Sequence, residues 1–323
     1  MSSYTLERQI AELAVLRASI LTKRVQSTVS GISKADDSPV TAADFAAQAV
    51  LISALRKAFP GDNFVDDEAL LASPKDVEEL LEVIDLGGRG QGGRKGRFWV
   101  MDPIDGTATF LKGEQYAVSL ALVEDGKEVV GVLGCANLKP VDDKVAESTI
   151  DKDGLGLMLT AVRGQGTTIR KMDFSGLQPA QPLDSVSKAS SPAEAQIINY
   201  SSGSTSRHDL IRKLASSFGA KFPNIELYSS HIRYAALLVG GGDFQLRIPS
   251  SDDVMMHIWD HAGAQLILTE AGGKVTDLDG KDMDFGAGRD LSQNNGLLAA
   301  RQGIHAAVLE SMKKILAEDA AST

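Results

Sequence analysis

Cysteine is almost absent from this chain: Cys135 is the only one among 323 residues. A single thiol excludes an internal disulfide bond and a zinc site made of several thiolates. Long apolar runs are absent as well, since no segment approaches the roughly 18–20 apolar residues that cross a bilayer. Charged side chains also interrupt residues 1–20, where a signal peptide would have an apolar core. We therefore expect a soluble, cytoplasmic protein without a membrane partner.

Positively charged residues are fewer than negatively charged ones. The chain has 33 Lys and Arg against 43 Asp and Glu, which gives a formal net charge of −10. Nucleic-acid binding needs a basic surface, so we expect no nucleic-acid partner, although a small anion can bind where cations are concentrated. Because 43% of the residues are hydrophobic and 24% are charged, the composition is that of a folded globular protein. At roughly 150 residues per domain, the length suggests two domains.

The N-terminal half has the patterns of helices and antiparallel strands. Apolar residues at spacings of three and four predict the first helix, and Asp125-Gly126 predicts a hairpin turn between two strands. We expect an α+β unit in which helices lie on one side of an antiparallel sheet. The predicted elements are helices over 6–20 and 41–59 and strands over 97–101, 116–124 and 128–135.

The C-terminal half alternates helices and strands, which is typical of an α/β unit. A stretch rich in Pro, Ser and Ala over 175–195 favours a domain boundary. The predicted domains are residues 1–182, the α+β unit, and residues 183–323, the α/β unit. In the second domain, helices are predicted over 207–218, 232–239, 258–271 and 304–318, and strands over 244–248, 274–276 and 296–299.

Two carboxylates stand at the end of an apolar strand, in the segment Trp99–Thr107. Asp102 and Asp105 are separated by a Pro-Ile pair, and the glycine that follows permits a tight turn. Such a loop can direct both carboxylates and the Ile104 carbonyl at one point, and oxygen ligands of this kind suit Mg²⁺. The alternative is an Asx-type turn, in which both side chains only bind backbone amides.

Further acidic positions each have a structural explanation as well as a chemical one. Asp66-Asp67-Glu68 follows an apolar pair at a strand end, where it forms either a solvated loop or part of a metal site. Asp44 stands three residues after Thr41, as in a helix-capping box. Asp260 lies near the start of an apolar helix, where the helix dipole favours an acid.

Taken together, these carboxylates indicate metal-assisted phosphoryl transfer. Two Mg²⁺ ions about 3.5–4 Å apart activate water and stabilise both ends of an in-line displacement. Asp44 and Thr107 would then orient and deprotonate the attacking water. A helix beginning near Asp260 would present backbone N–H groups to a phosphate.

Two motifs, Asp102-Pro-Ile-Asp-Gly-Thr107 and Trp259-Asp-His-Ala-Gly263, resemble the signature of the inositol monophosphatase superfamily, the lithium-sensitive, magnesium-dependent phosphatases. Segments 38–48, 92–99, 111–117 and 134–138 resemble its 3′(2′),5′-bisphosphate nucleotidase branch. The similarity extends from the first helix to about residue 300. It implies a layered α-β-α-β-α fold with the site between the two domains.

The resemblance also implies roles for residues by position. Asp44 and Thr107 correspond to the pair that activates water. The usual Gly-Glu-Glu stands here as Asp66-Asp67-Glu68, and we assign the remaining ligand to Asp67, which is one methylene shorter than Glu. The alternatives are that Glu68 takes its place or that the site binds metal more weakly. The ligands of the two or three Mg²⁺ ions are then Asp67, Asp102, the Ile104 carbonyl, Asp105 and Asp260.

The substrate that this branch implies is adenosine 3′,5′-bisphosphate (PAP), which loses its 3′-phosphate to give AMP and phosphate. The second implied substrate is the phosphosulfate analogue PAPS, which would give APS. A role in sulfate assimilation and salt tolerance, with inhibition by Li⁺ and Na⁺, is implied as well. Arg233 replaces the family's Lys, and Ser229 replaces its usual Asp. The residues expected to contact the nucleotide are Gly106, Thr107, His208, Ser230, Arg233, Arg247 and Asp260.

Three alternatives remain. An inositol phosphatase would share the metal motif but would need no adenine pocket. A zinc hydrolase could use His257 and His261, which are four residues apart on one face of the predicted helix, but no third ligand is evident. A sensor that has lost catalysis is favoured only by the altered Asp66-Asp67-Glu68 segment.

Overall fold

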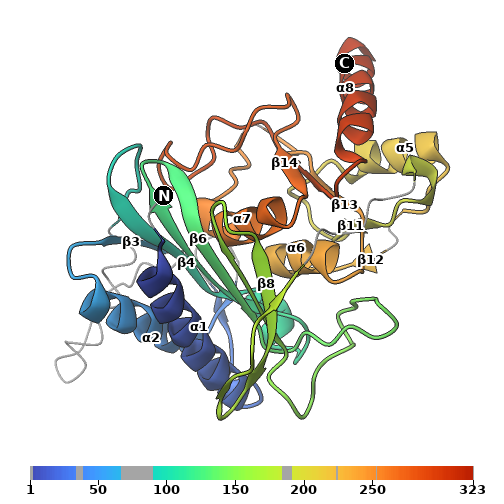
Figure 1. Cartoon of the computed structure of the whole chain (residues 1–323). Coiled ribbons are helices and arrows are strands. Elements are labelled where there is room, and N and C mark those ends of the chain that lie inside the picture. Colours follow the sequence, from blue (N-terminus) through green and yellow to red (C-terminus); the bar gives the residue numbers. More distant parts are fainter. Residues whose placement is uncertain are drawn as a thin grey trace.

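The computed structural model describes residues 3–33, 39–66, 90–183, 191–222, 225–251 and 253–322. Five layers follow one another across the molecule: two helices, a large sheet, two helices, a smaller sheet and two helices (Figure 1). The layered α-β-α-β-α fold, with α+β and α/β halves, is therefore confirmed. Within the described residues, no helix is both long enough and apolar enough to cross a bilayer.

The first layer consists of α1 (Thr5–Val25) and α2 (Ala42–Ala58), which pack against each other and against the large sheet. Small residues line their contacts: Ala11 and Ala18 in α1 and Ala47 in α2 are fully buried. These alanines favour the helical conformation and let the backbones approach closely. Both predicted helices are present. The apolar spacing misplaces the buried face of α1, however, because Leu6 and Leu13 are 55% and 47% exposed.

The large sheet has eight strands in the order β10-β8-β7-β6-β5-β4-β3, with β9 paired to β8. Only β3 and β4 run parallel. Because helices cover both faces, β5 and β6 are buried along nearly their whole length and show no polar alternation. The strands are β3 (Asn63–Asp66), β4 (Arg97–Asp105), β5 (Ala117–Glu124), β6 (Lys127–Cys135), β7 (Leu157–Val162), β8 (Thr167–Asp173), β9 (Gly176–Leu177) and β10 (Gln181–Pro182).

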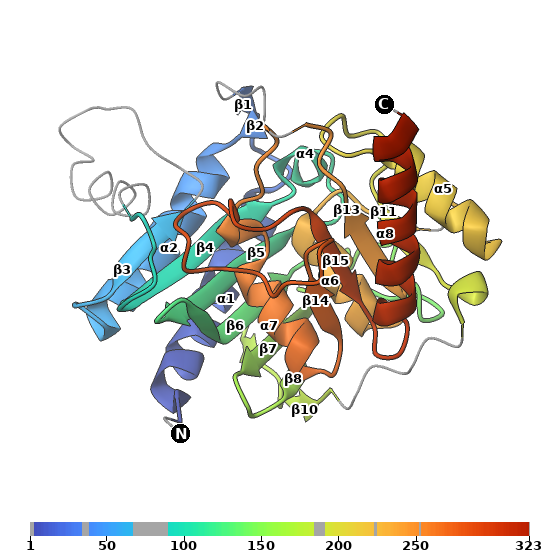
Figure 2. The same ribbon diagram turned by 90° about the horizontal axis from the view of Figure 1, so that it is seen from above.

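The middle helices α6 (Ser230–Leu238) and α7 (Ala262–Glu270) come from the C-terminal half and lie between the sheets (Figure 1). The smaller sheet has the order β12-β11-β13-β15-β14, and α5 (His208–Phe218) and α8 (His305–Ser322) cover its outer face (Figure 2). Its strands are β11 (Ile197–Asn199), β12 (Ile225–Glu226), β13 (Phe244–Arg247), β14 (Lys274–Thr276) and β15 (Leu297–Ala300).

One predicted helix is wrong in its first turn. Instead of a helix over 258–271, the chain forms a 3₁₀ turn, η3 (Ile258–Asp260), and then α7. His257 is extended, with φ −100° and ψ 148°. The shorter helix still ends as expected, since Gly272 has φ +87°.

The predicted division between residues 182 and 183 falls between the last strand of the large sheet and the first strand of the smaller one. An apolar cluster nevertheless contains residues from both halves, including Val100 of β4, Leu237 of α6 and Ala299 of β15. The two halves therefore share a core. The division into domains 1–182 and 183–323 stays a prediction.

Candidate active site

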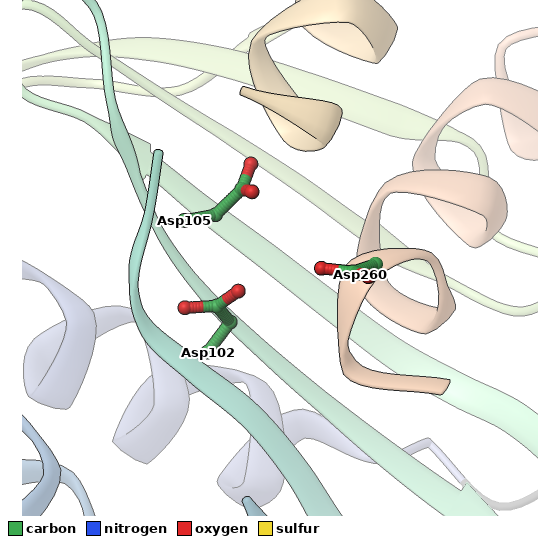
Figure 3. A group of neighbouring side chains, drawn as sticks. All are labelled: Asp102, Asp105 and Asp260. Atoms are coloured by element: carbon green, nitrogen blue, oxygen red, sulfur yellow. The ribbon is translucent and has the colours of Figure 1, made fainter. Parts of the chain in front are cut away.

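A β-bulge places two carboxylates on the same side of β4. Asp102 pairs with Ser119 of β5, but Asp105 pairs with Ala117, so three residues of one strand oppose two of the other. In a regular strand, side chains three residues apart point to opposite faces. The extra residue cancels that alternation, and both side chains lie on the side of β4 that faces Asp260 (Figure 3).

Three carboxylates converge from elements that are distant in the sequence. Asp102 and Asp105 come from β4, and Asp260 is the last residue of η3 (Figure 3). One oxygen of each lies within 4.8 Å of the others. Asp102 and Asp105 are only 6% and 7% exposed, so their mutual repulsion is poorly screened by solvent. We call these three residues the acidic cluster.

The N-terminus of α6 holds Asp105. The backbone N–H of His231 donates to Asp105 Oδ2 at 2.7 Å, and that of Ser230 donates to Oδ1 at 3.3 Å. The Ser229 hydroxyl also donates to Oδ2 and accepts from the backbone N–H of Ile232 at 3.1 Å. The N-terminal end of a helix has backbone N–H groups without partners in the helix, so α6 fixes the position of the Asp105 side chain.

Gly106 lets the N-terminus of α6 lie close to the end of β4. It has φ +92°, and a Cβ at this position would lie 2.9 Å from the Ser229 Cβ. Any other residue would therefore be strained and would push α6 away from the acidic cluster. The chain turns here into the short helix α4 (Thr107–Phe110). Gly106 thus positions the site through its backbone.

Asp44 uses its two oxygens for two different tasks. Oδ2 accepts from the Thr41 backbone N–H at 2.8 Å and from the Thr41 hydroxyl at 2.7 Å, which completes a capping box at the start of α2. Oδ1 accepts from the Thr107 hydroxyl at 3.2 Å. The same hydroxyl lies 3.0 Å from the Ile104 carbonyl oxygen. The cap therefore fixes the carboxylate in contact with Thr107.

The donor set of the acidic cluster fits a hard divalent cation. Its ligand atoms are carboxylate oxygens, and Ile104 lines the same cleft. Three carboxylates this close are most stable when a cation balances their charge. Of the predicted ligands, Asp102, Ile104, Asp105 and Asp260 are brought together. Asp67 and Glu68 lie outside the described residues.

A cleft of about 460 Å³ adjoins the acidic cluster. It lies where the parallel strands β11 and β13 end, a frequent place for ligands in α/β folds. Arg233 of α6 and Arg247 of β13 line it. Within the described residues, no carboxylate forms an ion pair with either guanidinium. We call these two residues the cationic pair.

Burial lowers the pKa of Arg233 from its ordinary value, while Asp105 acts in the opposite direction. Arginine side chains stay protonated in folded proteins, so the guanidinium keeps its charge. Its Nη2 donates to the Ser230 hydroxyl at 3.0 Å. Ser230 also lines the cleft, so both predicted contacts on α6 face the space where a ligand fits.

His208 lines the cleft, but protein groups occupy both of its ring nitrogens. Nδ1 lies 3.0 Å from the Asn199 amide nitrogen, and Nε2 lies 2.7 Å from the Gly203 carbonyl oxygen. The bonds require Nδ1 to accept and Nε2 to donate. A phosphate would have to displace Gly203 to receive the proton on Nε2. His208 therefore fixes the loop that precedes α5 in this structure.

The histidine arrangement that the zinc-hydrolase alternative requires is not found. Because His257 is extended, it does not share a helical face with His261. His257 Nδ1 lies 2.6 Å from Asp290 Oδ1, and its ring stacks on Trp259. His261 Nδ1 lies 3.2 Å from the Tyr234 hydroxyl, and burial lowers the pKa of His261 well below its ordinary value.

Several cleft residues were not predicted from the sequence. Tyr200 and Tyr228 form an edge-to-face pair with ring centroids 4.8 Å apart, and both line the cleft with Gln245. Both tyrosines follow short strands, β11 and β12, whose sequences have no clear pattern. Gln245 could have been found from the alternation in Phe244–Ile248, where polar residues at every second position predict one polar face.

Comparison with known proteins places the chain in a family. The sequence model of the inositol monophosphatase family matches residues 3–317. The chain belongs to this family. Its resemblance to the bisphosphate nucleotidase branch is confirmed by curated relatives of that name. It is 39% identical to the 3′(2′),5′-bisphosphate nucleotidase of Emericella nidulans, over 97% of this chain and 99% of that protein. It is 33% identical to that of Oryza sativa, over 98% and 96%.

Solved structures show the same fold as this inositol monophosphatase family member. An IMPase/NADP phosphatase complexed with NADP and Ca²⁺ has a TM-score of 0.67 and 17% identity, over 96% of each chain. The Thermotoga maritima IMPase has a TM-score of 0.64 and 22% identity, over 97% of this chain and 98% of that one. Enzymes of the family use metal ions, which agrees with the acidic cluster.

Proposed function

We propose that the chain is a Mg²⁺-dependent 3′(2′),5′-bisphosphate nucleotidase. It removes the 3′-phosphate of PAP to give AMP and phosphate, and it converts PAPS to APS in the same way. The relatives named 3′(2′),5′-bisphosphate nucleotidase support this substrate class. The observation that carries the proposal is a single cleft lined both by the acidic cluster and by the cationic pair.

The two groups match the two phosphates of the substrate. Asp102, Asp105 and Asp260, with the Ile104 carbonyl and Asp67, are the residues that would hold two or three Mg²⁺ ions. Bound Mg²⁺ would offset the charge of the 3′-phosphate and make water a stronger nucleophile. Arg233 and Arg247 are left for the other phosphate, since guanidinium groups bind phosphate oxygens through paired N–H donors.

Asp44 and Thr107 are the residues proposed to take the proton from the attacking water. The hydrogen bond from the Thr107 hydroxyl to Asp44 Oδ1 leaves lone pairs on the threonine oxygen. That oxygen can accept a proton from water while the hydroxyl proton moves to Asp44. The capping box holds the carboxylate in place, so the proton path is already aligned before substrate binds. Gly106 shapes the turn that carries Thr107.

A substrate panel tests this proposal. Phosphate release would be measured from PAP, PAPS, adenosine 3′-monophosphate and inositol 1-phosphate, with and without Mg²⁺. We expect turnover only with Mg²⁺, and a kcat/KM for PAP at least about 100-fold above that for inositol 1-phosphate, because only PAP uses the cationic pair. Faster hydrolysis of inositol phosphates would instead support the alternative, an inositol phosphate phosphatase.

Inhibition by Li⁺ and Na⁺ belongs to the same proposal, with roles in sulfate assimilation and salt tolerance. If a monovalent ion replaces one Mg²⁺, inhibition should persist at saturating PAP and weaken as Mg²⁺ is raised. Rates measured over a grid of Li⁺ and Mg²⁺ concentrations check this. Full activity in millimolar Li⁺ at low Mg²⁺ would count against a site of the usual kind. The cytoplasmic location stays a prediction from the sequence.

A further inference from the structure

Gln245 is a buried amide that lines the cleft and has no role so far. It lies on β13 and is only 5% exposed. Its amide nitrogen has no hydrogen-bond partner within the described residues. Buried amides are nearly always hydrogen-bonded, because losing water without a replacement destabilises the folded state. A buried amide nitrogen without a partner on the wall of a cleft therefore indicates a contact with a bound ligand.

The alternation of β13 fixes the direction of this side chain. Phe244, Leu246 and Ile248 belong to the apolar cluster shared with α5 and α8, on the outer face of the smaller sheet. Gln245 and Arg247 therefore lie on the inner face, which is turned toward α6 and the large sheet. Side chains two residues apart on one face are about 6.6 Å apart along a strand. Gln245 is thus a neighbour of Arg247, and both line the cleft with Arg233.

Unpartnered N–H groups gather on this wall. The Nε atoms of Arg233 and Arg247 are also buried without a hydrogen-bond partner among the described residues. Guanidinium groups can only donate, and an amide donates through its nitrogen. A wall with donors from three side chains and two positive charges matches an anion with several acceptor oxygens, such as a phosphate.

We propose that Gln245 is a specificity-determining residue that donates from its amide nitrogen to the phosphate that remains on the nucleotide, beside Arg233 and Arg247. The inference rests on the proposed function and extends it. Neither amide atom of Gln245 is hydrogen-bonded to a described residue. Rotation about χ3 can therefore turn the nitrogen toward the phosphate without breaking a hydrogen bond.

A neutral donor suits this position better than a third cation. Arg247 already acts on Arg233 as a like charge and helps to lower the pKa of Arg233. A further buried positive charge would add repulsion in the absence of ligand. Glutamine adds a hydrogen bond to the phosphate and leaves that repulsion unchanged.

The test compares Gln245→Met, Gln245→Glu and Thr160→Val with the unaltered protein. Methionine is unbranched and of similar length but has no N–H, and glutamate replaces the donor with a negative acceptor. Thr160 is the control, because its hydroxyl is also buried without a partner among the described residues and it does not line the cleft. Steady-state kinetics with Mg²⁺ would be measured for PAP and for adenosine 3′-monophosphate, which lacks the second phosphate.

We expect Gln245→Met to lower the ratio of kcat/KM for PAP over the 3′-monophosphate by about 10- to 100-fold, mainly through KM, as for loss of a hydrogen bond to a charged group. Gln245→Glu should lower the ratio further, and Thr160→Val should leave it within about 3-fold. An unchanged ratio in both Gln245 variants would overturn the inference, as would an equal loss on both substrates.

Thermal unfolding without ligand separates a ligand contact from a structural role. Because the amide is unpartnered, Gln245→Met should unfold at the same temperature as the unaltered protein or higher. A lower unfolding temperature together with equal losses on both substrates would assign Gln245 a structural role instead. If the unaltered protein itself does not prefer PAP, the proposed function fails first, which is a different result from an unchanged ratio in the variants.

Discussion

The acidic cluster and the cationic pair line the same cleft, but the protein supports them differently. Asp105 receives hydrogen bonds from the N-terminus of α6. Asp44, which accepts a hydrogen bond from Thr107, is held by a capping box. Arg233 and Arg247 keep buried Nε atoms without partners among the described residues. The fold thus supplies hydrogen-bond partners for Asp105 and Asp44. The Nε atoms of Arg233 and Arg247 have no such partner among the described residues.

Under the proposed function, this difference corresponds to the division between catalysis and substrate selection. Groups that act on the reacting phosphate must be in place before the reaction, and hydrogen bonds from the protein provide that order. Groups that select a substrate gain most when their partners arrive only with that substrate, because other ligands leave buried donors unpaired. Four predictions probe the contrast, from the largest expected effect to the smallest.

The largest effect is expected from Asp44→Asn. The amide cannot take up the Thr107 hydroxyl proton, so kcat should fall by about 10²–10⁴-fold, as for loss of a general base. KM for PAP should change by less than about 5-fold, since Asp44 lies outside the cationic pair. Steady-state kinetics at saturating Mg²⁺ measure both constants, and an unchanged kcat would remove Asp44 from the proton path.

A smaller and more selective effect is expected from Arg247→Met. The loss of charge-assisted hydrogen bonds should lower kcat/KM for PAP by about 10- to 100-fold, with little change for adenosine 3′-monophosphate. Arg301→Met is the matched control, because Arg301 is a buried arginine outside the cleft whose Nε donates to the Leu237 carbonyl at 3.0 Å. That control should lose stability and keep the substrate ratio. Equal losses on both substrates in Arg247→Met would contradict the assignment.

Ser229→Ala tests the support of the acidic cluster. It removes the cap of α6 and the hydroxyl that donates to Asp105. We expect the Mg²⁺ concentration for half-maximal activity to rise about 10-fold or more, as when the hydrogen-bond partner of a metal ligand is lost. Stability should fall by about 1 kcal/mol from the missing cap. Ser175→Ala, at an exposed turn, is the control, and a Mg²⁺ requirement equal to that of the unaltered protein would speak against the support by Ser229.

The smallest effect concerns a buried acid outside the cleft that does have a cationic partner. Burial raises the pKa of Glu128 to about 7, although Arg163, whose Nη2 donates to Oε2 at 2.7 Å, pulls it down. In the unfolded chain this pKa is about 4.3. Between these values the folded state binds more protons, so Glu128 makes the free energy of unfolding fall as pH rises.

Glu128→Gln removes that dependence. Its unfolding temperature relative to the unaltered protein should therefore rise by a few degrees between about pH 5 and pH 7.5. Melting curves across this range, with the exposed Glu194→Gln as a control, measure the difference. Parallel curves for Glu128→Gln and the unaltered protein would mean that burial does not outweigh the ion pair there. Such a result would also weaken the argument that burial makes the charges of Arg233 and Arg247 unfavourable without a bound anion.

The sequence predicted the elements where local chemistry decides the structure. Periodicity and caps gave α1, α2, α5 and α8, and Asp125-Gly126 gave the β5–β6 hairpin. Prediction failed where tertiary packing decides. The sequence did not predict β7 or β8. For β7 the reason is that burial on both faces removes the polar alternation. The apolar residues at 258–260 fit a 3₁₀ turn as well as the first turn of an α-helix, so the sequence predicted a helix there.

Asp44 shows what a local sequence pattern can predict and what it cannot. The spacing from Thr41 predicted a cap, whereas the catalytic role came from the set of carboxylates and the family resemblance. The structure shows the cap, with the second oxygen of Asp44 bonded to Thr107. Its catalytic role stays a prediction. Asp67 was assigned only through the family resemblance and lies outside the described residues.

The sequence by itself determined the chemical repertoire: oxygen ligands for a hard cation, a threonine beside them and a small number of arginines in an acidic chain. Only the tertiary structure decided which of these groups meet. The bulge in β4 turns Asp102 and Asp105 to one side, and the packing of α6 and η3 between the sheets brings Ser229 and Asp260 to them. These contacts join segments far apart in the chain, so their geometry depends on the packing of the whole core and not on any local pattern.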